Sequence, residues 1–146
     1  MKKRYRIVAL IALAISVGLV INDYTKISTF KEVVSDRLNG ELSSIAIITS
    51  LTDDPLEDEI YITDSSQIEL IMNALSRAKL RKVRSFPIIN YPENYTILLK
   101  INNKINFMVE LYGKDYIYIS SADPKYAGVY KITNEFDPIV IQGLFK

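Results

Sequence analysis

The chain has 146 residues, no histidine, no cysteine, and a formal net charge of +1 from 18 Lys and Arg and 17 Asp and Glu residues. These absences exclude disulfides, thiol chemistry, histidine-based nucleophile pairs and histidine-ligated zinc. Four cations precede the first apolar run, so 14 cations face 17 anions in the rest of the chain. A domain with this slightly acidic balance is a poor candidate for nucleic-acid binding.

An apolar run near the N-terminus, from Ile7 to Ile21, contains no charged residue. A transmembrane helix needs about 20 residues, with a lower limit of about 17. Tyr5 and Tyr24 extend the run and suit the two membrane interfaces. The cations before it are Lys2, Lys3, Arg4 and Arg6. Because cations favour a cytoplasmic N-terminus, residues 1–24 are predicted to be a single-pass membrane anchor followed by an extracytoplasmic domain.

The same features are typical of a cleaved secretory signal peptide. Cleavage needs small residues at positions −3 and −1, and Ser16-Val17-Gly18 is the best local match. Apolar residues 19–21 follow it, in place of the polar start of a mature protein. We therefore predict that the anchor is not cleaved. A secreted domain is the alternative, and a buried soluble helix is the least favoured interpretation.

Residues 25–41 are predicted to link the anchor to the domain as an amphipathic helix from Thr25 to Leu38. Thr29 and Glu32 have capping-box spacing, and Gly40 is suited to the end of the helix. The predicted extracytoplasmic domain then covers residues 42–146.

The first half of the domain is predicted to be a β-hairpin followed by a helix. Residues 42–51 and 59–63 have the β-branched content and alternation of strands. Asp64 is suited to cap a helix over residues 65–78. Its apolar residues follow the helical period: Ile68, Ile71, Met72 and Leu75. This stripe predicts the face that packs on the sheet.

The second half is predicted to be a meander of strands and a closing helix. The elements in order are a basic extended segment 79–84, a loop 85–93, strands 95–101, 105–111, 116–119 and 129–132, and a helix 134–145. Short hairpins make the sheet mainly antiparallel, which leaves the helices on one face. The predicted fold is therefore a two-layer α+β domain behind an N-terminal transmembrane helix.

This order of elements resembles that of small exported or membrane-anchored domains of unknown function from Gram-positive bacteria. The resemblance runs from about Ser43 to Leu144. It is carried by EIYITDSSQIELIMNAL (Glu59 to Leu75), the basic segment, the meander and the terminal YKI (Tyr130 to Ile132). It implies a compact α+β domain outside the cytoplasmic membrane, and it implies no active site.

An acidic run is the densest charge cluster of the chain, and it consists of Asp53, Asp54, Glu57, Asp58 and Glu59. Its spacing does not match an EF-hand loop, so a solvated turn is predicted, with a weak cation site as the alternative. A pair of glycosidase carboxylates is disfavoured because the chain has no tryptophan to line a sugar cleft.

A basic run follows the predicted helix and consists of Arg77, Lys79, Arg81, Lys82 and Arg84. Such charges protect the edge strand of a sheet from self-pairing. The alternative is a strand that meets anionic lipid headgroups or wall polymers.

Tyrosines are concentrated in the second half of the chain. Alternation in the strand 116–119 puts Tyr116 and Tyr118 on one face and both isoleucines on the other. The isoleucines are the better core residues, so the tyrosines are predicted to face away from the helices. Tyr112 or Tyr95 joins them depending on the strand register. Packing within the sheet explains this pattern, and a binding face for a protein partner is the alternative.

The sequence contains no catalytic motif, and we expect neither a cofactor nor a metal. The predicted function is that of a non-catalytic, membrane-anchored domain that binds a protein partner at the cell envelope. A sensor or anionic-polymer-binding domain that uses residues 77–84 is the alternative.

Overall fold

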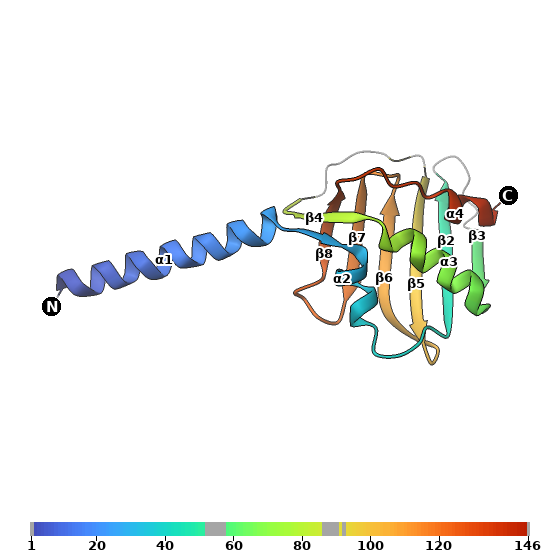
Figure 1. Ribbon diagram of the computed structural model, residues 1–146, viewed down its shortest axis with the longest axis horizontal. Helices are drawn as coiled ribbons and strands as arrows, with labels where there is room; N and C mark the ends of the chain where they lie inside the picture. The colour runs from blue at the N-terminus through green and yellow to red at the C-terminus, as the bar shows by residue number, and fades with distance from the viewer. Residues whose placement is uncertain (1, 52–57, 86–90, 92, 146) are drawn as a thin grey trace.

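The structure is a computed structural model that describes residues 2–51, 58–85, 91 and 93–145 (Figure 1). Its α-helices are α1 (Lys2–Thr25), α2 (Phe30–Val33), α3 (Ser65–Ser76) and α4 (Ile139–Gln142), with 3₁₀ turns at Ser35–Arg37 and Gly143–Phe145. Its strands are β1 (Ile27–Thr29), β2 (Ser44–Leu51), β3 (Asp58–Ile62), β4 (Lys79–Val83), β5 (Glu93–Ile101), β6 (Lys104–Tyr112), β7 (Tyr116–Ser121) and β8 (Gly128–Ile132).

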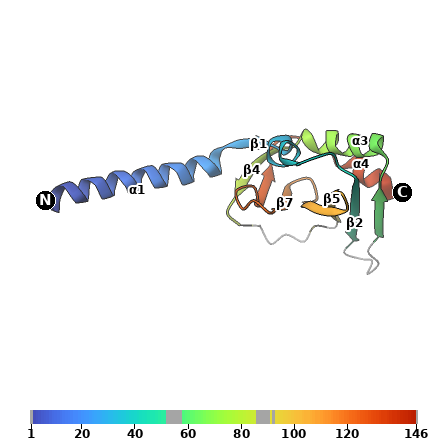
Figure 2. The same ribbon diagram turned by 90° about the horizontal axis from the view of Figure 1, so that it is seen from below.

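The strands form one sheet in the order β1-β4-β8-β7-β6-β5-β2-β3, in which all neighbouring pairs are antiparallel. Helices α3 and α4 lie on one side of this sheet (Figure 2). The predicted α+β class, antiparallel sheet and one-sided helical layer are therefore confirmed. The hairpin of β5 and β6 turns at Asn102 and Asn103, which have φ of +49° and +62°. Asparagine tolerates this left-handed conformation better than most residues.

Helix α3 connects two strands that lie at or near opposite edges of the sheet. It begins after β3 at one edge and leads to β4 next to the opposite edge. The Asp64 side chain caps it by accepting the backbone N–H of Gln67 at 3.0 Å. Ile68, Ile71 and Leu75 are buried, so the predicted packing face is confirmed. The helix therefore crosses the sheet as a cover for its apolar face.

The segment between α1 and β2 is part of the domain, and the predicted linker helix over residues 25–38 is wrong. Residues 27–29 form β1, which pairs with β4. The capping box of Thr29 and Glu32 is present, but it starts only the single turn of α2. The Phe30 N–H donates to the Ala78 carbonyl at 3.0 Å, and Phe30 and Val34 are fully buried. Strand pairing and core burial therefore replace the continuous helix that local spacing predicts.

The closing helix is also shorter than predicted. Only residues 139–142 are α-helical, followed by one 3₁₀ turn. Asn134 has another role, because its Oδ1 accepts the Lys79 N–H at 2.7 Å and its Nδ2 donates to the Arg77 carbonyl at 3.0 Å. Its side chain thus holds the junction of α3 and β4. Pro138 precedes the short helix, where it does not interrupt a helical hydrogen bond.

The core lies between the sheet and the helical layer. Its largest fully buried side chains are Phe30, Ile45, Ile47, Ile71, Leu75, Leu80, Ile97, Leu99, Leu111, Ile117, Ile119 and Ile141. Most of them come from alternate positions of the strands, as period-two patterning requires.

Helix α1 extends away from the domain as a single rod (Figure 1). The predicted helical conformation of residues 7–21 is confirmed. Within the described residues, no helix is both long enough and apolar enough to cross a membrane.

Candidate functional site

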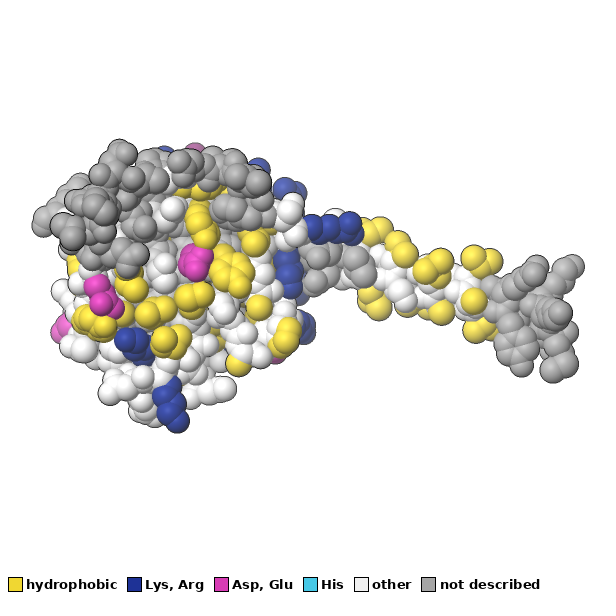
Figure 3. All heavy atoms as spheres, turned by 180° about the vertical axis from the view of Figure 1, so that it is seen from behind, with side chains coloured by type: hydrophobic (Ala, Val, Ile, Leu, Met, Phe, Trp, Pro, Cys, Tyr) yellow, Lys and Arg dark blue, Asp and Glu magenta, His cyan; other side chains and the backbone are white. Residues whose placement is uncertain are grey.

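The side of the sheet opposite the helices carries apolar side chains in rows across the central strands. We call this surface the open face. Its apolar members on β2, β5, β6, β7 and β8 are Ala46, Ile48, Leu98, Met108, Tyr112, Tyr116, Tyr118 and Val129. Apart from Ala46, which is buried, these side chains are half-buried in the folded chain. Figure 3 shows apolar side chains gathered over the middle of this side.

Tyr116 and Tyr118 lie on the open face, as predicted, while Ile117 and Ile119 are fully buried in the core. Tyr112 is paired with Tyr116 across the β6–β7 ladder and joins them. Tyr95 does not join them, so its inclusion in the predicted partner face is wrong.

The β5–β6 register explains the position of Tyr95. This residue is paired with Leu111, which is a core residue, while its neighbour Asn94 is paired with Tyr112. Tyr95 is therefore on the helical side, where it is 5% exposed and its ring centroid lies 5.8 Å from that of Phe145.

Part of the tyrosine surface is covered by the chain itself. The Tyr91 ring packs on Tyr112 and Tyr116, with centroid distances of 6.2 Å and 6.5 Å. Gly113 permits this contact, because a Cβ at that position would lie 3.0 Å from the Tyr91 ring. Tyr112 also donates its hydroxyl to Glu110. Burial and this hydrogen bond raise the pKa of Tyr112 to about 12, so its ring stays neutral at physiological pH.

The accessible part of the open face is therefore centred on Tyr118 and Met108, and one further tyrosine lies beside it. Tyr61 on β3 is paired with Ala46 and is 62% exposed. The Lys100 ammonium lies 4.9 Å from the centroid of its ring. Tyr61 is not part of the predicted partner face. Its alternation with Ile60 and Ile62 along the strand nevertheless indicates that it faces away from the core.

The predicted basic strand is not the edge of the sheet, because β1 pairs with β4 on its outer side. The edge interpretation is therefore wrong for residues 79–81, which pair with β1. Alternation also separates its cations. Arg81 is paired with Lys131 on the open side, whereas Lys82 is paired with Tyr130 on the other. Arg77 stands at the end of α3. The five predicted cations, which also include Lys79 and Arg84, do not form one surface.

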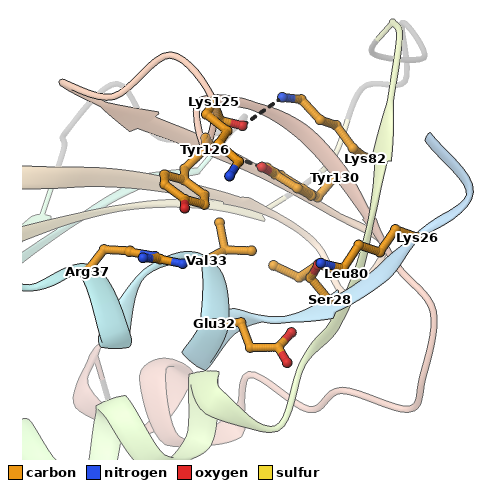
Figure 4. Close-up of a pocket in the computed structure, with 10 residues that line it drawn as sticks. All are labelled: Lys26, Ser28, Glu32, Val33, Arg37, Leu80, Lys82, Lys125, Tyr126 and Tyr130. Carbon is orange, nitrogen blue, oxygen red and sulfur yellow. Dashed lines mark hydrogen bonds between the residues drawn. The ribbon is translucent and has the colours of Figure 1, made fainter. Parts of the chain in front are cut away.

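A different set of cations does come together. Lys82 lines a pocket of about 280 Å³ with Lys26, Arg37 and Lys125 (Figure 4). These four residues belong to four separate segments of the chain, so no local pattern in the sequence reveals the group. The strand pairing of β1, β4 and β8 brings them together.

The acidic run lies largely outside the described residues, so the alternative of a cation site there stays a prediction. Of its members with a described side chain, Glu59 is exposed on β3. Within the described part of the chain, no group of three or more Asp and Glu residues is arranged to hold a metal ion.

Comparison of the chain with protein-family models, with curated proteins and with solved structures found no significant match. The resemblance to Gram-positive envelope domains stays a prediction.

Proposed function

We propose that this protein is a non-catalytic, membrane-anchored domain that binds a protein partner outside the cytoplasm through the open face. The observation that carries the proposal is the one-sided helical layer. The helices cover one face of the eight-stranded sheet, and the other presents half-buried Leu98, Met108 and Tyr118. Tyrosine and methionine are enriched at protein interfaces, and contiguous apolar patches mark interaction sites.

The anchor in this proposal is α1. Residues 5–24 of α1 rise about 30 Å, which matches the bilayer core of about 30 Å. Its large apolar side chains are 49–65% exposed: Ile7, Val8, Leu10, Ile11, Leu13, Ile15, Val17, Leu19 and Ile21. Such a surface is costly in water, and a lipid environment would remove that cost. The four cations in the first turns of α1 support a cytoplasmic N-terminus.

The anchor is expected to remain in the mature protein. Intact-mass spectrometry of the membrane fraction should give a species that contains residues 7–21. A matched control is the double variant Ser16→Ala with Gly18→Ala, which creates an Ala-x-Ala cleavage site. The lower mass of this variant after cleavage provides the reference for a processed chain in the same cells. A mature N-terminus at Leu19 or later in the unaltered chain would contradict the anchor.

The open face is expected to capture the partner. A photo-crosslinking amino acid at position 118 in intact cells should give one discrete adduct, and the same group at position 70 should not. Leu70 is the matched site because it is apolar and 57% exposed, but it lies on α3. The double variant Met108→Ala with Tyr118→Ala should weaken binding by about 2 kcal/mol or more, roughly 30-fold, because hot-spot residues have effects of this size.

Weaker binding supports the proposal only if the double variant is folded. Circular dichroism and the midpoint of unfolding test whether it is. Binding that survives the double variant, or equal adducts from positions 70 and 118, would place the partner elsewhere. The alternative of an anionic-polymer-binding strand at residues 77–84 has weaker support, because alternation distributes those cations over both faces.

A further inference from the structure

The cationic pocket lies where the rod of α1 meets the domain. Lys26 directly follows α1, and Arg37 belongs to the 3₁₀ turn after α2. Lys82 lies on β4, and Lys125 lies in the loop between β7 and β8. Figure 4 shows Lys82 and Lys125 on one side of the hollow and Arg37 and Lys26 on the other. The remaining lining residues are Ser28, Glu32, Val33, Leu80, Tyr126 and Tyr130.

The charge of this pocket is not balanced by its own lining. Four cations face one carboxylate, that of Glu32, and this group already accepts the Thr29 N–H at 2.9 Å in the capping box. Among the described residues, no ion pair joins a carboxylate to any of the four cations. Asp36 and Asp123 line a neighbouring hollow that shares Arg37 and Tyr126 with this pocket, but neither carboxylate lines this pocket itself. Like charges around one hollow repel each other, and a bound anion relieves that repulsion.

Two of the cations are held in place by the fold. The Arg37 guanidinium carbon lies 4.6 Å from the centroid of the Tyr126 ring, which orients the planar group. The Lys82 ammonium donates to the Lys125 carbonyl at 3.1 Å. Gly128 leaves room for the Lys82 stem, because a Cβ there would lie 3.1 Å from its Cε. The Tyr130 hydroxyl donates to the Tyr126 carbonyl at 2.8 Å and fixes the same loop. These interactions therefore position the donors of Arg37 and Lys82 before any ligand binds.

From this geometry we propose that the pocket binds the phosphate group of a small phosphomonoester or phosphodiester. Arginine presents a rigid fork of donors that matches phosphate, and lysine supplies point charges beside it. The volume of about 280 Å³ is near the lower limit of ligand pockets, about 300 Å³, which suits a headgroup-sized ligand. Val33 and Leu80 also line the pocket, but they are 4% and 0% exposed and offer almost no surface to a ligand.

Two sources supply this chemistry, an anionic lipid headgroup and a free phosphoester. The position of Lys26 at the end of α1 would bring the pocket close to a bilayer surface if α1 is anchored. That link depends on the proposed function, but phosphate binding itself does not. Separate probes therefore distinguish the two sources.

The test uses the full chain, labelled with ¹⁵N and held in neutral detergent micelles, and follows the amide signals of residues 125–130. One titration uses glycerol 3-phosphate, and the other uses dihexanoyl phosphatidylglycerol. We expect saturable shifts with at least one probe. Tighter binding of the lipid identifies a headgroup site, and equal or tighter binding of glycerol 3-phosphate identifies a site for soluble phosphoesters.

The double variant Arg37→Gln with Lys125→Gln should weaken binding at least tenfold. The matched control, Lys104→Gln with Lys114→Gln, removes the same charge from exposed residues outside the pocket and should change the affinity by less than twofold. The unchanged amide spectrum of each variant establishes that it is folded. Absence of saturation with both probes, or equal loss in the control, would overturn the proposal. Because both probes are added in solution, a missing protein partner or a cleaved anchor would leave this result unaffected.

Discussion

Replacing Phe30 with alanine is expected to lower the free energy of unfolding by about 3–5 kcal/mol, because buried Phe→Ala changes lose transfer energy and leave a cavity. Phe30 is 0% exposed and belongs to the segment that local spacing assigns to a linker. A loss of this size is a large fraction of the 5–15 kcal/mol that is typical of a domain. Urea unfolding of the full chain in detergent, followed by circular dichroism, measures it.

Lys31→Ala is the control for Phe30, because Lys31 is exposed on the same turn of helix. Its effect should stay within about 0.5 kcal/mol, as is usual for surface substitutions. Equal midpoints for the two variants would mean that residues 27–38 are a detachable linker, contrary to the structure.

Ile71→Ala should cost about 2–5 kcal/mol by the same measurement. Ile71 is 1% exposed on the inner side of α3, in contact with the core. Its neighbour Leu70 is 57% exposed, so Leu70→Ala removes a side chain of equal size without opening a cavity. A shift for Ile71→Ala no greater than that for Leu70→Ala would show that α3 does not cover the sheet through this face.

Elements that are determined by residues close together in the sequence could be predicted from the sequence. The strand from Tyr116 alternates apolar and aromatic residues at the period of the sheet, and α3 has both a cap at Asp64 and an apolar stripe. The segment around Phe30 has a local cap at Thr29, but no local feature determines the rest of its conformation. Its conformation depends on pairing with β4, some 50 residues further along the chain. A capping box marks where a helix starts, but it does not show how far the helix continues.

The candidate sites follow the same division. Alternation alone assigns Tyr116 and Tyr118 to the open face, whereas Tyr95 required the register of β5 against β6. The basic run was visible in the sequence, but the pleat separates its members. Arg37 and Lys125 meet Lys82 only because β1, β4 and β8 are neighbours in the sheet. Charge density along the chain is thus a weaker guide to a binding site than charge density in the fold.

The connection between α1 and the sheet also has a mechanical consequence. In the view of Figure 2, β1 continues roughly in the direction of α1. The ladder bonds of an antiparallel pair are perpendicular to the strands, so a pull along α1 stretches the three-residue β1–β4 pairing in shear, with its bonds sharing the force. In a chain held by a bilayer at one end and by a partner at the other, tension would pass through this joint. Because β1 and β4 share only three residue pairs, this pairing is expected to break before the longer β5–β6 ladder. The part of the sheet that carries the open face would then stay folded under tension.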